Sequence, residues 1–104
     1  MNTKERRNYL EDGFIIPIEK NNVSGYASIN KEMICAGSEM APTGHYFVYL
    51  LHPQRGSLHF TIEQEIAAGQ WFVRDHVVDI ETDILLEIGI AIYKEEQRIL
   101  DKAS

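Results

Sequence analysis

The side chains that could do acid–base, nucleophilic or metal chemistry here are four histidines and a single cysteine. His52 and His59 lie in strand-like runs on either side of Pro53-Gln54-Arg55-Gly56, and we expect them to be diagonal neighbours on one hairpin face, near Glu63. A zinc site generally needs three or four ligands, and the chain has no HExxH, CxxC or 2-His-1-carboxylate spacing. The sequence therefore predicts no metal site, and the histidines are interpreted as strand residues.

Cys35 could in principle pair with a histidine as a nucleophile, covered by the loop-like stretch Gly37–Gly44. Its neighbours Ile34 and Ala36 are typical of a sheet interior, where cysteine serves as a small hydrophobic residue. Neither GxGxxG nor GxxxxGK[ST] occurs in the chain. We therefore predict no catalytic residue and no cofactor, and whether the protein is an enzyme stays open.

The charge balance argues against two classes of partner. Ten basic and 16 acidic residues give a formal charge of −6, and such a surface repels phosphate backbones and anionic headgroups. No stretch approaches the ~20 apolar residues that span a bilayer. With one cysteine the chain cannot form an internal disulfide. We expect a cytoplasmic protein that binds neither nucleic acid nor membranes.

The clearest structural element is a hairpin over His45–Gln64. Pro53 presets φ at the start of the loop and Gly56 can adopt the left-handed conformation that closes it, so His52 is expected opposite Ser57. That register gives one face for the helix to cover, made of Phe47, Tyr49, Leu51, Leu58, Phe60 and Ile62. Tyr46, Val48 and Leu50 would then lie on the outer face.

Shorter strands are expected before and after this hairpin. Phe14–Glu19 contains Pro17, which confines it to a sheet edge, and Asn21-Asn22 forms a turn after it. Further expectations are a second hairpin of Gly25–Ile29 and Glu32–Ala36 around Asn30-Lys31, a mobile loop at Gly37–Gly44, and a short strand at Trp71–Val73. We expect Trp71 and the tyrosines to serve the core or an interface.

Asp79–Ala103 fits two different periods. As a helix it has Asp79 or Thr82 as N-cap, acidic residues first and basic residues last. One face would carry Ile80, Ile84, Leu85, Ile88, Ala91, Ile92 and Ile99. As a strand, isoleucine and leucine alternate from Ile84 to Ile92, and Gly89 is poor helix material. The caps, the charge gradient and the run KEEQRILDK favour a long helix.

Together these elements predict an α+β fold, with an antiparallel meander of five to six strands and a long C-terminal helix packed on one face. The 104 residues fit a single domain, with residues 1–12 a loosely ordered N-terminal segment.

A second apolar stripe on the helix is the basis of the functional hypothesis. Leu86, Ile90 and Tyr93 lie away from the first face, so one sheet cannot cover both. We therefore expect a non-enzymatic protein-interaction module that acts as a homodimer; its interface candidates are Leu86, Ile90, Tyr93, Val48 and Leu50. The alternative is a small-molecule-binding protein or small enzyme with a cleft between sheet and helix, lined by Tyr46, His52, His59 and Cys35.

Overall fold

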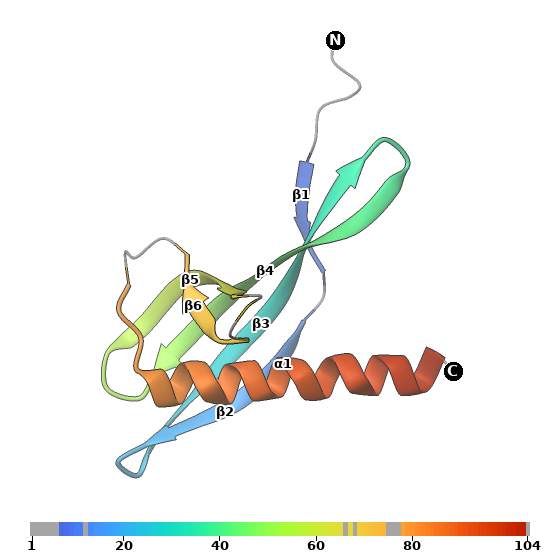
Figure 1. Cartoon of the computed structure of the whole chain (residues 1–104). Coiled ribbons are helices and arrows are strands. Elements are labelled where there is room, and N and C mark those ends of the chain that lie inside the picture. The colour runs from blue at the N-terminus through green and yellow to red at the C-terminus, as the bar shows by residue number, and fades with distance from the viewer. Residues whose placement is uncertain (1–6, 12, 66, 68, 75–77, 104) are drawn as a thin grey trace.

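The computed structural model describes residues 7–11, 13–65, 67, 69–74 and 78–103. It confirms the α+β class, with a six-stranded antiparallel sheet and one long C-terminal helix lying against it (Figure 1). The elements are β1 (Arg7–Leu10), β2 (Phe14–Lys20), β3 (Val23–Ala36), β4 (Glu39–His52), β5 (Gly56–Gln64), β6 (Trp71–Val73) and α1 (Thr82–Ala103).

Strand order is β1-β3-β4-β5-β6, with β2 also paired to β3. β1 pairs with residues 32–35 of β3 and β2 with residues 23–29, so the two follow one another along one edge. Pro17 lies in β2, which pairs with β3 and with no other described strand, as predicted for an edge strand. Arg7–Leu10 of the N-terminal segment form β1, while residues 1–6 and 12 lie outside the described residues.

The predicted second hairpin is wrong, because β3 runs unbroken through Asn30-Lys31. Asn30 pairs with Phe47 and Lys31 with Tyr46, so the long partner strand β4 satisfies the backbone where we expected a turn. The register shifts between Lys31 and Met33, which marks a β-bulge.

The predicted mobile loop Gly37–Gly44 is also wrong. The turn takes only Gly37 and Ser38, with Gly37 at φ 70°, and Glu39 already pairs with Ala36. By contrast, Asn21 (φ 53°) and Asn22 (φ 65°) form the expected tight turn, with the two positive φ angles of type I′. The strand at Trp71–Val73 is confirmed as β6.

The hairpin of β4 and β5 is present, but its register differs by one residue from the prediction. His52 lies opposite Gly56 rather than Ser57, because the loop contains three residues and Gly56, at φ 82°, joins the ladder. A one-residue slip turns one strand's side chains to the other face. The core face of β4 is therefore made of Tyr46, Val48, Leu50 and His52, opposite Leu58, Phe60 and Ile62 of β5.

This slip corrects part of the predicted interface. Val48 and Leu50 are fully buried between sheet and helix, so they cannot meet a partner. The core also contains Ile18, Ala27, Ile29, Phe60, Ile62, Val73, Ile80, Ile84, Ile88 and Ile92. The C-terminal segment thus follows the helical period, and the alternative strand is not formed.

The helix begins one residue away from a predicted cap. The Leu85 N–H donates to the Glu81 carbonyl at 3.1 Å, which gives Glu81 the N-cap position expected for Asp79 or Thr82. Asp83 lies in the first turn and Lys102 in the last, as the helix macrodipole favours. In the described part of the chain, no helix is both long and apolar enough to cross a membrane.

Candidate functional site

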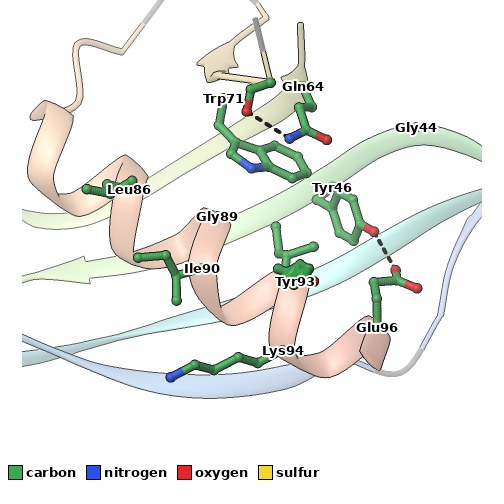
Figure 2. Close-up of a pocket in the computed structure, with 12 residues that line it drawn as sticks. Gly44, Tyr46, Gln64, Trp71, Leu86, Gly89, Ile90, Tyr93, Lys94 and Glu96 are labelled. Carbon is green, nitrogen blue, oxygen red and sulfur yellow. Dashed lines mark hydrogen bonds between the residues drawn. The ribbon is translucent and has the colours of Figure 1, made fainter. Parts of the chain in front are cut away.

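A groove of about 680 Å³ lies between α1 and the strands β4, β5 and β6 (Figure 2). Trp71 and Tyr46 contribute aromatic rings from the sheet, and Leu86, Ile90 and Tyr93 contribute apolar side chains from the helix. Polar groups come from Gln64, Lys94 and Glu96. The cleft predicted between sheet and helix therefore exists, with mostly different residues in it.

Trp71 packs directly on the helix backbone at Gly89. A Cβ placed at the buried Gly89 would come within 2.6 Å of Trp71 Nε1, so the indole fits only where the helix has no side chain. The ring of Tyr46 meets Trp71 edge-to-face, with centroids 5.5 Å apart. The glycine that weakened the helix prediction is thus where the groove wall contacts the helix.

Tyr46 is held by a charged pair at one end of the groove. Its hydroxyl donates to Glu96 Oε1 at 2.6 Å, and Lys31 Nζ lies 2.7 Å from the same oxygen. Burial raises the pKa of the Tyr46 phenol, and its bond to Glu96 raises it further. Partial burial opposes ionisation of Glu96, but bonds from Lys31 and Tyr46 lower its pKa overall. Tyr46 therefore acts as a fixed hydrogen-bond donor, because its phenolate is disfavoured.

The outer stripe of α1, defined as Leu86, Ile90 and Tyr93, lies on the solvent side of this groove. These residues are 61%, 47% and 60% exposed. In Figure 2 their side chains project from successive turns of the helix. The predicted second stripe is therefore present and uncovered in the single chain.

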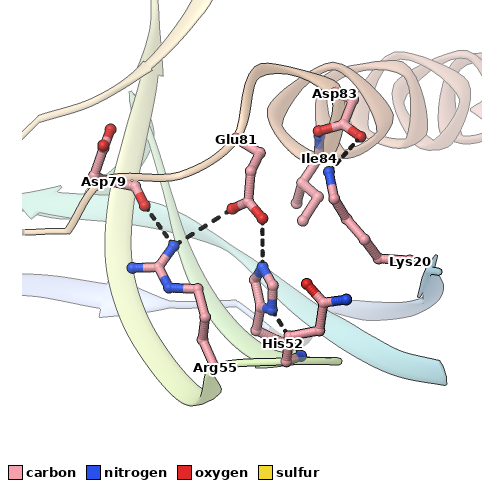
Figure 3. Close-up of polar contacts among 8 residues, drawn as sticks. Lys20, His52, Arg55, Asp79, Glu81, Asp83 and Ile84 are labelled. Atoms are coloured by element: carbon pink, nitrogen blue, oxygen red, sulfur yellow. Dashed lines mark hydrogen bonds and ion pairs between the residues drawn. The ribbon is translucent and has the colours of Figure 1, made fainter. Parts of the chain in front are cut away.

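His52 lies elsewhere, in a closed polar cluster where the β4–β5 turn meets the start of α1 (Figure 3). Its Nδ1 accepts from the Gln54 backbone N–H at 3.0 Å, so the ring proton lies on Nε2 and points to Glu81 Oε2 at 2.7 Å. Arg55 Nη1 bridges the Asp79 carbonyl and Glu81 Oε1. With both nitrogens bonded and its side chain fully buried, His52 has no site for a substrate.

Glu81 connects this cluster to the helix. Partial burial would raise the pKa of its carboxyl group, but hydrogen bonds from its own backbone N–H and from His52, with the charge of Lys20 nearby, lower it overall. Lys20 also pairs with Asp83 at 2.8 Å. The polar groups around His52 thus attach the first turn of α1 to β2 and to the β4–β5 turn.

The remaining predicted ligand residues are far from the groove. His59 is on the outer face of the sheet, its ring centroid 4.7 Å from that of Tyr49. Cys35 is half-buried at the end of β3, with Sγ 3.5 Å from the Gly37 carbonyl oxygen. Of the predicted set Tyr46, His52, His59 and Cys35, Tyr46 alone lines the groove. The described residues contain no group of three or more potential metal ligands.

Sequence reasoning missed Gln64, Gly89, Lys94 and Glu96 as groove residues. Gly89 was the available signal, because a lone glycine inside an apolar helix indicates close approach of another group. The polar residues gave no such signal, since Gln64 on β5 and Lys94 and Glu96 on α1 come together only through the packing of the helix on the sheet.

The outer face of the sheet is a second surface, which carries several aromatic rings. Tyr26 stacks on Tyr49 with ring centroids 6.1 Å apart, and Phe47 lies 6.1 Å from His59. Its central positions carry no Asp, Glu, Lys or Arg; they are Tyr26, Ser28, Asn30, Phe47, Tyr49, Leu51, Ser57, His59 and Thr61.

Comparisons of the chain with protein-family models, with curated proteins and with solved structures each find no match.

Proposed function

We propose that this chain is a non-enzymatic protein-interaction module that acts as a homodimer through the outer stripe of α1. The observation that carries the proposal is the exposure of Leu86, Ile90 and Tyr93 beside an open apolar groove. Burying a large apolar side chain contributes about 1.5–3 kcal/mol. A partner that covers the stripe would therefore gain several such contributions at once.

The chemistry of the stripe suits an interface core. Such cores are depleted in charge and rich in large anchors, and Tyr is enriched among the residues that dominate binding energy. Tyr93, Leu86 and Ile90 provide three large side chains on one helix side. The nearby Trp71 is packed against Gly89 and is already fixed, so little side-chain entropy is lost when a partner covers it.

The polar residues support a non-enzymatic role. His52, the one buried polar side chain among the described residues, is bonded at both ring nitrogens. Tyr46 is held as a donor to Glu96. Neither side chain has the combination of access and reactive proton that acid–base catalysis needs.

Sedimentation equilibrium tests the proposal. The native chain should sediment as a dimer, and Ile90→Glu should give a monomer because a carboxylate would be buried at the interface. Ile15→Glu is the matched control: Ile15 is 68% exposed, but it lies on β2, away from the stripe. A native chain that stays monomeric at high micromolar concentration would contradict the proposal.

The groove itself favours a second candidate, a small-molecule-binding protein. Its volume of about 680 Å³ lies within the range of roughly 300–1,000 Å³ typical of ligand pockets. Trp71 is the chain's single tryptophan, so its emission reports directly on the groove. Energy transfer from Trp71 to the fluorescent dye anilinonaphthalene sulfonate, in a chain that is monomeric, would favour this candidate over the homodimer.

A further inference from the structure

We infer that the outer stripe of α1 is covered by the same stripe of a second copy, with the two helices antiparallel and a twofold axis passing beside Ile90. This inference rests on the proposed function and adds to it the relative orientation of the two copies. Two patterns on the exposed side of α1 support it: the order of the apolar residues and the order of the charges beside them.

The apolar order fits an antiparallel pair. Leu86 lies four residues before Ile90 and Tyr93 three residues after it, so the three form one row on the helix. A twofold axis at Ile90 brings Leu86 of one copy against Tyr93 of the other and Ile90 against its own equivalent. A large aromatic ring then packs against an aliphatic side chain at both ends of the contact, which is a self-complementary surface.

The charge order fits the same orientation and no parallel one. Asp83, Glu87, Lys94 and Arg98 form a row next to the stripe, with acidic residues in the N-terminal half and basic residues in the C-terminal half. Figure 2 shows Lys94 on the side of the stripe away from Trp71. Twofold symmetry brings this row beside its own copy, reversed, so Glu87 meets Lys94 and Asp83 meets Arg98. In a parallel pair the two rows would lie on opposite sides of the contact, so Glu87 and Lys94 could not pair between the copies.

Glu87 and Lys94 are available for this pairing. Both are exposed, and neither has a hydrogen bond or ion pair with another described residue. Asp83 and Arg98 already pair with Lys20 and Glu95, at 2.8 and 2.7 Å, so their share of the contact is smaller. Glu87 and Lys94 are thus the residues that would gain an ion pair from a second copy.

The outer face of the sheet lacks such an indicator of partner or orientation. Its central positions carry no charge, and its aromatic rings already contact one another. The row of charged residues beside the stripe on α1, by contrast, is complementary to its own copy in the antiparallel orientation.

Cysteine cross-linking tests the orientation. In a Cys35→Ser background, Ile90→Cys lies near the axis and should form an intermolecular disulfide readily under mild oxidation. Leu86→Cys is the control, because it starts from a similarly exposed residue but lies one turn from the axis. At 1.5 Å rise per residue, its copy is about 12 Å away along the helix, too far for a disulfide. Mixing Leu86→Cys with Tyr93→Cys should restore cross-linking between the two variants.

Charge reversal tests the pairing independently. Glu87→Lys or Lys94→Glu alone should raise the dimer dissociation constant about tenfold, because each places like charges together twice per dimer. The double variant should return the dissociation constant to near the native value. Circular dichroism checks that each variant is folded.

The outcomes separate the two claims. Disulfides at Ile90→Cys but not at Leu86→Cys, together with rescue by the double variant, support the antiparallel pair. Equal cross-linking of Leu86→Cys and Ile90→Cys in a dimer would indicate parallel helices and overturn the inference while leaving the homodimer intact. A chain that is monomeric throughout overturns both.

Discussion

Two regions lie against the same helix: the polar cluster around His52, and the groove with the outer stripe. They differ in how many of their side chains already have partners within the chain. At the start of α1, His52, Glu81 and Arg55 bond to one another and to backbone groups. Along the middle of α1, Leu86, Ile90 and Tyr93 have about half or more of their surface in solvent.

The histidine and the charged residues at the start of α1 are bonded within the fold, while the exposed apolar residues in its middle form the surface that we propose for recognition. Changes at the His52 cluster should therefore affect stability and leave association unchanged. Substitutions at the stripe should weaken association and leave the stability of the monomer unchanged. To keep the two effects apart, stabilities below refer to the Ile90→Glu background, which we expect to be monomeric.

The largest stability effect is expected for His52→Ala. It leaves the Gln54 N–H and the Glu81 carboxylate without their imidazole partner. Together with the cavity, this should cost about 2–4 kcal/mol of unfolding free energy. Urea denaturation followed by circular dichroism measures it. His59→Ala on the same hairpin is the control and should change stability by less than about 0.5 kcal/mol. Equal losses for the two variants would mean that the polar cluster around His52 does not stabilise the fold.

Gly89→Ala should have the next largest effect. A methyl group at this position meets the Trp71 indole, and overpacking of this kind costs about 1–3 kcal/mol. Alanine regains up to about 1 kcal/mol of helix propensity, so the net loss should be about 1–2 kcal/mol. Trp71 emission should shift to longer wavelength as the ring moves into solvent. A stabilised variant with unchanged emission would show that the groove wall does not need the glycine.

Tyr46→Phe should cost less. It keeps the ring against Trp71 but removes the hydroxyl bonded to Glu96, a loss of about 1 kcal/mol because Glu96 is partly exposed and keeps its bond to Lys31. Dimer dissociation should stay unchanged, because Tyr46 lies behind the stripe. Loss of association with unchanged stability would assign Tyr46 to the interface instead of the scaffold.

The smallest effect is the acid dependence of the cluster. The pKa of Glu81 is lowered from its ordinary value of 4.5, so its contribution to stability is present above that value and is lost as the pH falls through the lower, folded-state value. Urea midpoints measured from neutral pH downward should therefore fall, and Glu81→Gln should show a shallower fall. An identical pH profile for this variant would exclude Glu81 as a contributor.

Several parts of the fold could be predicted from local signals. Proline in β2, paired asparagines in a tight turn, and opposite charges at the two ends of α1 each act within a few residues. The helical period won over the strand alternation because Ile80, Ile84, Ile88 and Ile92 can be buried on one face. Leu86, Ile90 and Tyr93 followed from the same period.

The rest depends on pairing between distant residues. Asn30-Lys31 has the composition of a turn, but pairing with β4 satisfies its backbone, and this cannot be read from either strand alone. The slip at Gly56 moved Val48 and Leu50 into the core and separated His52 from His59. One residue of register therefore decided which predicted site residues came together.

We propose that the chain recognises its own copy through the outer stripe of α1 and not through the sheet. Amide chemical shifts recorded by nuclear magnetic resonance over a dilution series distinguish the two surfaces, because they report which residues respond to association. We expect concentration-dependent shifts around Leu86–Arg98 and Trp71, with the centres of β3, β4 and β5 unchanged. Shifts confined to those strands, or none at any concentration, would exclude association through the stripe.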